Sequence, residues 1–314
     1  MHVGWSKHGT SVALVALAAS LAAACDERDA GTASEEAPAA AAEGPPEAGP
    51  IPEAWVERRV AEAEERLGQT EAGRLVWQAV EAHGGLKAWL EKGTIAFEFD
   101  YRPLGKPEER KHTENRVDLW RSRAWQKELG EDGDATFGFD GETAWIVPGP
   151  DAFPAPARFW ATTPYYFVGL PWVLADPGTR FERLDDAELD GETYRVVKVS
   201  YEDDTGDTPD DYYVTYIHPE TSHVDAIRYV VSYPAFFPDG GHSPEKLMRY
   251  LDRREVDGLE VAHRYETHAF DAESNEPGEK VTDVDVDDVR FGETWPADLF
   301  APPEGAHIDE SHRP

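Results

Sequence analysis

An alternation of apolar and polar residues with a period of two runs through most of the chain after residue 93 and constrains its fold most strongly. Between Thr94 and Tyr101, large apolar side chains occupy every second position, as in a strand with one buried face. Asp-Gly pairs, which are typical of two-residue hairpins, occur at residues 140–141, 190–191 and 257–258. Further strands are expected over residues 115–128, 136–147, 194–201, 212–218, 223–233, 248–256, 259–270 and 283–287. No strand–helix–strand alternation is present, so the pattern predicts an antiparallel meander.

Two helices are expected before the strands. The first covers residues 53–67, begins after Pro52 and ends at Gly68. The second begins at Thr70, a favourable N-cap residue, and carries apolar residues at spacings of three and four. It ends at His83, which is followed by two glycines, so His83 is interpreted as a helix cap rather than a catalyst. The apolar face of this helix is expected to pack on the sheet.

The N-terminus is typical of an exported lipoprotein. The apolar run from Ser11 to Ala24 is too short to span a bilayer and indicates a secretory signal. It ends in Leu21-Ala22-Ala23-Ala24-Cys25, which resembles the bacterial lipobox, where the cysteine receives a diacylglyceride. The alternative is ordinary cleavage after Ala-x-Ala. Cys25 is the only cysteine in the chain, so no internal disulfide can form, and we expect Cys25 to be lipidated.

Composition sets the expected domain boundaries. Residues 1–24 form the signal peptide, and residues 25–52, rich in Ala, Glu, Pro and Gly, form a disordered tether. Residues 53–69 form the N-terminal helix, residues 70–303 form one β-rich domain, and residues 304–314 form a disordered tail. Because the chain can form no internal disulfide, the domain has to be held together by its hydrophobic core.

The net charge excludes two classes of partner. The chain has 30 Lys and Arg against 63 Asp and Glu, a formal charge of −33. A surface with this much negative charge repels nucleic-acid phosphates and anionic lipid headgroups. We therefore expect neither nucleic-acid binding nor electrostatic association with a membrane. Membrane attachment has to come from the lipid on Cys25.

Motifs for common catalytic chemistry are missing from the sequence. It contains no Gly-x-Ser-x-Gly, no His-Glu-x-x-His and no glycine-rich phosphate loop, and no enzyme is expected. A loop between two strands carries carboxylates that are candidate oxygen ligands for Ca²⁺, the one cofactor considered. These candidates are Asp203, Asp204, Asp207, Asp210 and Asp211. The loop lacks EF-hand spacing, and a solvated turn is the alternative.

The mid-chain segment from residue 156 to residue 174 is the most apolar part of the mature chain, and it has to lie on something apolar. Together with five short stretches, one of which overlaps it, it resembles a known family. The stretches are Ala82-His83-Gly84-Gly85, Phe139-Asp140-Gly141, Leu170-Pro171-Trp172-Val173-Leu174-Ala175-Asp176-Pro177, Gly206-Asp207-Thr208-Pro209-Asp210-Asp211-Tyr212-Tyr213 and a closing Trp295-Pro296-Ala297-Asp298-Leu299-Phe300-Ala301-Pro302-Pro303. They are similar to the superfamily of bacterial lipoprotein-sorting factors, the periplasmic carrier and the outer-membrane receptor. More narrowly, they resemble an uncharacterised periplasmic lipoprotein group related to it.

The resemblance implies the fold and the site. The expected fold is mainly β with helices: one strongly curved antiparallel sheet, an incomplete β-barrel, with N-terminal helices and a mid-chain helix-loop lid over a hydrophobic cavity. No functional residue of the sorting factors finds a matching motif here. Aromatic residues would form the cavity or its lid: Phe97, Phe99, Phe139, Trp145, Phe159, Trp160, Tyr165, Tyr166, Phe167 and Trp172.

The function expected on this basis is non-catalytic binding of a lipid or another hydrophobic molecule by a protein anchored at the periplasmic face of a bacterial membrane. Whether that is the inner or the outer membrane stays open. Two alternatives also stay open. One is a Ca²⁺-dependent module or enzyme centred on the acidic loop 203–211, and the other is an anchored module whose aromatic segment docks a protein partner.

Overall fold

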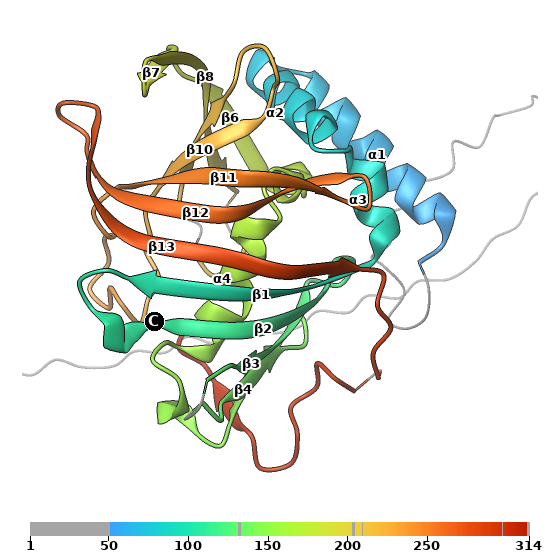
Figure 1. The fold of residues 1–314 in the computed structure, drawn as a ribbon. Coiled ribbons are helices and arrows are strands. Elements are labelled where there is room, and N and C mark those ends of the chain that lie inside the picture. The colour runs from blue at the N-terminus through green and yellow to red at the C-terminus, as the bar shows by residue number, and fades with distance from the viewer. Residues whose placement is uncertain (1–50, 131–132, 203–204, 209, 297, 313–314) are drawn as a thin grey trace, which may run out of the picture. The chain divides into compact units, whose positions relative to one another are not determined.

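The alternating segments pair into one antiparallel sheet of fourteen strands (Figure 1). The computed structural model describes residues 51–312, apart from residues 131–132, 203–204, 209 and 297. The strands follow the order β14-β5-β4-β3-β2-β1-β13-β12-β11-β10-β9-β8-β6, and β7 pairs with β8. Because β14 and β6 lie at opposite ends of this order, the sheet curves without closing. The fold is therefore an open half-barrel, as the sequence predicts.

The strands have the following bounds: β1 Thr94–Pro103, β2 Lys111–Asp118, β3 Arg123–Glu128, β4 Thr136–Phe139, β5 Ala144–Val147, β6 Thr179–Arg183, β7 Ala187–Leu189, β8 Glu192–Tyr201, β9 Tyr213–Ile217, β10 Val224–Tyr229, β11 Lys246–Val256, β12 Leu259–Asp271, β13 Glu276–Phe291 and β14 His307–Asp309. The helices are α1 Glu53–Gly68, α2 Glu71–Ala82, α3 Leu86–Lys92 and α4 Ala157–Val168. Three short 3₁₀ turns are η1 Pro107–Glu109, η2 Pro150–Ala152 and η3 Trp172–Ala175.

Two of the three expected Asp-Gly hairpins are confirmed. Asp190-Gly191 and Asp257-Gly258 have positive φ at both positions, the conformation that lets two residues join twisted strands. At Asp140 the connection is longer, because the Asp140 carboxylate accepts hydrogen bonds from the backbone N–H groups of Glu142 and Thr143. The single strand expected over residues 115–128 is also a hairpin. Its turn is stabilised by the Asp118 carboxylate, which accepts hydrogen bonds from the backbone N–H groups of Trp120 and Arg121.

The helices cap and cover one side of the sheet. Thr70 is the N-cap of α2, as predicted, and its hydroxyl accepts from the Gly73 N–H at 3.0 Å. His83 is the C-cap of α2, and its carbonyl accepts from the Glu260 N–H on β12. Gly84 has φ +111° and lies so close to the β11–β12 turn that a Cβ would be 2.4 Å from the Gly258 carbonyl oxygen. The His-Gly pair of the sequence motif therefore joins helix α2 to the sheet.

The C-terminal segment differs from the disordered tail expected over residues 304–314. Residues His307–Asp309 form β14, which pairs with β5 at the edge of the sheet. The Asp309 carboxylate accepts from the backbone N–H of Arg158 at 2.9 Å, so it satisfies a free donor in the first turn of α4. Ser311 also contacts the Tyr233 hydroxyl at 2.9 Å. Residues 304–314 are mostly polar and show no alternation of apolar and polar residues, so the sequence did not indicate these long-range contacts.

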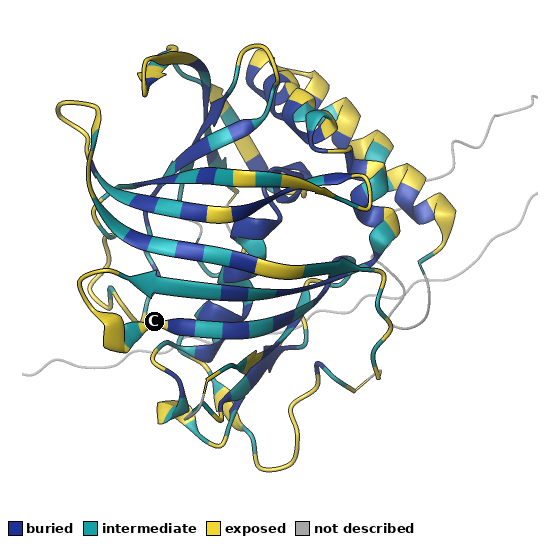
Figure 2. Ribbon diagram, in the orientation of Figure 1, coloured by how far each residue is buried: buried dark blue, intermediate teal, exposed yellow. Residues whose placement is uncertain are grey.

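The buried residues concentrate on the concave face and under the helices, while the outer side of α1 is exposed (Figure 2). Phe97 and Phe99 of β1 are each 1% exposed and belong to this core. On β13, Val284 and Val286 are buried, whereas Asp283, Asp285 and Asp287, which alternate with them, are less buried and point to the other face. This alternation agrees with the half-exposed strand that the sequence predicts there. Among the described residues, no helix is both long and apolar enough to cross a membrane.

Candidate functional site: an aromatic cavity beneath helix α4

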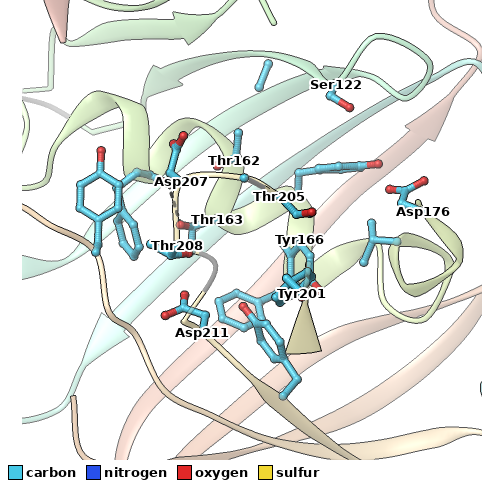
Figure 3. A pocket seen from close by; sticks show the side chains of 18 of the residues that line it. Ser122, Thr162, Thr163, Tyr166, Asp176, Tyr201, Thr205, Asp207, Thr208 and Asp211 are labelled. Carbon is cyan, nitrogen blue, oxygen red and sulfur yellow. Dashed lines mark hydrogen bonds between the residues drawn. The ribbon is translucent and has the colours of Figure 1, made fainter. Parts of the chain in front are cut away.

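A cavity of about 390 Å³ lies between α4, the loop that follows β8, and the concave face of the sheet (Figure 3). Strands β8, β9 and β10 contribute Tyr201, Tyr213 and Tyr229 to its wall, and α4 contributes Phe159 and Tyr166. Its volume lies within the range of small-molecule pockets, and its wall is mostly apolar with a few polar groups, as is usual for ligand sites. The cavity is therefore the candidate binding site.

Helix α4 is held over the sheet in spite of a proline in its middle. Pro164 has no N–H, so the carbonyl of Trp160 lacks its usual helical donor. The buried amide of Gln126 on β3 fills this place, since its Nε2 donates to the carbonyls of Trp160 at 2.8 Å and Ala161 at 3.0 Å. Trp160 itself turns towards β1, with its ring centroid 5.4 Å from that of Tyr101. The two faces of α4 are thus divided between the sheet and the cavity.

Tyrosines are the most frequent residues in the cavity wall. They are Tyr165, Tyr166, Tyr201, Tyr213, Tyr229 and Tyr233. The Tyr213 ring stacks against Tyr166 on one side at 5.0 Å and against Tyr229 on the other at 6.1 Å, measured between ring centroids. The hydroxyls of Tyr166 and Tyr201 are hydrogen-bonded to each other. Burial raises the pKa of Tyr213 and Tyr201 well above the usual value, so these rings stay neutral.

An ion pair joins the first turn of α4 to the loop opposite. The Arg158 guanidinium donates from Nε to Asp207 Oδ2 at 2.5 Å and from Nη2 to Asp207 Oδ1 at 2.8 Å. The two side chains are 13% and 21% exposed. The guanidinium carbon also lies 3.7 Å from the centre of the Phe139 ring. Arg158 therefore connects the helix, the loop and the sheet around the cavity.

Two further carboxylates face the cavity from opposite sides (Figure 3). Asp211 is 8% exposed, and its Oδ1 accepts from the Ser232 N–H at 2.6 Å and the Ser232 hydroxyl at 2.7 Å. Burial raises the pKa of Asp211, against the effect of these hydrogen bonds. Asp176 lies after η3 with its side chain about half exposed, 3.4 Å from the Arg59 guanidinium. Surrounding protein raises the pKa of Asp176 to about 6, which Arg59 opposes.

The structure brings five of the ten aromatic residues predicted for the site to the cavity wall. These are Phe139, Phe159, Tyr165, Tyr166 and Phe167. Phe97, Phe99 and Trp160 are buried core residues between β1 and α4. Trp172 is buried as well, and its ring stacks on Trp89 with centroids 4.5 Å apart. Trp160 and Trp172 are 5% and 1% exposed, so they offer no surface to a partner protein.

Trp145 lies on the opposite face of the sheet from Phe139. Its indole N–H donates to the Phe300 carbonyl at 2.8 Å, under the closing C-terminal segment. The hairpin register pairs Trp145 with Gly138, so Trp145 shares a face with Gly138 and not with Phe139. The sequence could have shown this separation. If Phe139 pairs with an even-numbered residue of the next strand, Trp145 has to point to the opposite face of the sheet.

The acidic loop is divided between several partners. Asp207 binds Arg158 and Asp211 binds Ser232, while Asp203 and Asp204 lie outside the described residues. Within the part of the chain that the structure describes, no group of three His, Cys, Asp or Glu side chains is placed to hold a metal ion. Cys25 and the predicted signal peptide and tether, apart from residues 51–52, also lie outside the described residues.

The cavity residues that the sequence did not single out are the tyrosines of β8 and β10 and the threonines Thr205 and Thr208 of the loop after β8. Residues 159–243, which hold most of the cavity wall, match a family of unknown function, DUF6503. No curated protein matches the chain. An open half-barrel with a helix-covered cavity is the class of fold that these elements define.

Solved structures similar to this chain include members of the superfamily that the sequence resembles. One is a LolA superfamily protein from Nitrosomonas europaea, with 12% identity, a TM-score of 0.48, and coverage of 74% of this chain and 98% of that one. Another is a putative outer membrane lipoprotein-sorting protein domain from Vibrio parahaemolyticus, with 12% identity, a TM-score of 0.40, and coverage of 69% and 97%. A DUF1329 family protein from Desulfovibrio piger has 9% identity, a TM-score of 0.47, and coverage of 73% and 96%. At such identities a likeness says nothing about the ligand.

Proposed function

We propose that this protein binds a lipid or another hydrophobic molecule in the cavity beneath α4, without catalysis, while anchored to the periplasmic face of a bacterial membrane. The observation that carries the proposal is the cavity itself, about 390 Å³ with aromatic walls on the concave side of the sheet. An apolar molecule entering it gains roughly 25 cal/mol for each Å² of apolar surface removed from water, before ordering costs. The volume suits one drug-sized molecule or one acyl chain.

Helix α4 acts as the lid in this proposal. It is attached to its surroundings by polar contacts that can open and close: the Arg158–Asp207 pair and the Asp309 carboxylate at its first turn. The apolar contacts of Trp160 and Phe167 keep its inner face on the sheet. An opening at the Arg158 end exposes the cavity without unfolding the core.

The membrane anchor is a separate part of the proposal and rests on the lipobox-like sequence before Cys25. Replacing Cys25 by Ala should release the protein from the membrane fraction and abolish its labelling with radioactive palmitate. Retention of Cys25→Ala in the membrane would contradict lipid anchoring at this residue. The result does not depend on whether the cavity binds a ligand.

Cavity binding can be tested with the neutral fluorescent probe N-phenyl-1-naphthylamine. Val231 lines the cavity, and Val231→Trp should fill part of it and abolish the fluorescence increase. Leu104→Trp is the matched control, because Leu104 is 49% exposed and does not line the cavity. Equal binding by the wild type and both variants would contradict the proposed site.

A further inference from the structure

The charged groups around the cavity are unbalanced. Three carboxylates line it, those of Asp176, Asp207 and Asp211. Arg158 is the one Lys or Arg side chain among the described lining residues, and both oxygens of Asp207 already bind it. Asp176 is paired with the Arg59 guanidinium at 3.4 Å, whereas Asp211 accepts hydrogen bonds from a neutral serine. Asp211 is therefore the cavity carboxylate that has no ion-pair partner among the described residues.

The aromatic wall adds to the same preference. The faces of tyrosine rings attract positive charge, and so do their hydroxyl oxygens. The hydroxyls of Tyr166 and Tyr201 are hydrogen-bonded to each other. The negative charge of nearby Asp211 helps to raise the pKa of both tyrosines. The formal charge of −33 over the whole chain disfavours the approach of anions from solution. Arg158, the cation of the described wall, already binds both oxygens of Asp207 through Nε and Nη2, which weakens its attraction for an anion, although its buried Nη1 has no hydrogen-bond partner.

From this arrangement we infer that the ligand is a positively charged amphiphile, with its apolar chain among the tyrosines and its cationic end against Asp211. The inference rests on the proposed function and narrows its ligand class: anionic lipids and fatty acids are disfavoured. The cationic end lies near the loop after β8, and the apolar chain extends towards Phe167 and Tyr229, whose ring centroids are 5.4 Å apart.

The test compares three probes with the same twelve-carbon chain, each below its critical micelle concentration: dodecyltrimethylammonium, dodecyl maltoside and laurate. Isothermal titration calorimetry on the full chain should give binding of the cationic probe at least tenfold tighter than that of laurate. The preference should shrink as NaCl is raised, because salt screens the carboxylates. Equal affinity for the three probes, or tighter binding of laurate or the maltoside, would overturn the inference and leave the proposed function standing. Failure of all three to bind would overturn both.

Variants locate the preference. Asp211→Asn keeps the shape and the acceptor oxygen for Ser232 but removes the charge, and it should reduce the preference for the cationic probe at least threefold. Glu255→Gln is the matched control, since Glu255 is exposed on β11 and absent from the cavity wall. Dodecyl maltoside affinity should be unchanged in Glu255→Gln, and in Asp211→Asn it should fall by less than the affinity for the cationic probe. A preference that stays the same in Asp211→Asn would place the cationic probe elsewhere and overturn the inference.

Discussion

Arg158 shows how one side chain can connect several parts of the site. Its backbone N–H binds Asp309, its guanidinium binds Asp207, and its guanidinium carbon lies over the ring of Phe139. An ion pair with good two-point geometry and limited exposure is worth more than a surface pair, because less water screens it. Helix α4, the proposed lid, is therefore held by the Arg158–Asp207 ion pair, which the sequence pattern did not reveal.

Removal of the charge of Asp207 tests this contact. Asp207→Asn leaves the Arg158 guanidinium partly covered without a counter-charge, and we expect it to lower the free energy of unfolding by about 2 kcal/mol. Urea denaturation measures the loss. Asp186→Asn is the matched control, because Asp186 pairs with Arg183 but is 50% exposed, and its loss should stay below about 1 kcal/mol. Similar losses in the two variants would contradict a special role for the Arg158 pair.

His83 makes stability depend on pH. Burial lowers the pKa of His83 to about 3, although its Nδ1 contacts the Ala79 carbonyl at 2.7 Å. In the unfolded chain its pKa is about 6.5, so the unfolded state binds the proton first as the pH falls. The stability associated with the neutral ring is complete above pH 6.5 and decreases by roughly 1.4 kcal/mol per pH unit between 6.5 and the folded pKa.

The pH dependence of unfolding in His83→Asn checks this. Between pH 6.5 and pH 4.5 the wild type should lose stability more steeply than the variant, whereas His242→Asn, at an exposed loop position, should follow the wild type. The slope is the readout, since the substitution also changes stability at pH 7. Parallel slopes for His83→Asn and the wild type would show that His83 is not buried in its neutral form.

At the scale of elements, α4, the proposed lid, lacks one helical hydrogen bond, and another element replaces it. Pro164 deprives the Trp160 carbonyl of its donor, and Gln126 of β3 supplies one. Gln126→Leu leaves a buried carbonyl without a partner and should cost about 1–3 kcal/mol in denaturant unfolding. In a Pro164→Ala background the new N–H at residue 164 satisfies the Trp160 carbonyl, so the same substitution should cost less. Strictly additive effects in this double-mutant cycle would contradict the compensation.

Most of the helices and strands can be predicted from the sequence, whereas the turns and pairings that join them are harder to predict. Period-two alternation and the Asp-Gly pairs at 190–191 and 257–258 predict the meander because these signals are local. The β2–β3 turn was missed because it depends on hydrogen bonds to Asp118 rather than on Gly or Pro. Strand β14 was missed because three residues with no alternation carry no signal until β5 is placed beside them.

The candidate site shows the same limit. Aromatic content identified α4, and Phe139, Phe159 and Tyr166 of the predicted set do line the cavity. Phe97 and Trp172 have similar composition and lie in closely packed core, because composition does not say where a curved sheet and a helix fail to meet. The acidic loop was considered for Ca²⁺, yet Asp207 binds Arg158 and Asp211 binds Ser232.

For the molecule as a whole, the open sheet, helix α4 and the cavity form one arrangement. An open sheet lets a helix lie against its concave face, and a fully packed concave face would leave no site. The fourteen strands form an open sheet, and α4 lies against it (Figure 1). Tyrosines of β8, β9 and β10 line the cavity between them. Binding of a hydrophobic molecule in this space is the central claim.

Native mass spectrometry of the full chain, purified from its own membrane in a mild detergent, tests that claim most directly. The account predicts a bound molecule that survives transfer to the gas phase, is released on denaturation, and is absent from Val231→Trp but present in Leu104→Trp. A wild-type mass that equals the lipidated polypeptide alone, together with no binding of N-phenyl-1-naphthylamine, would contradict it.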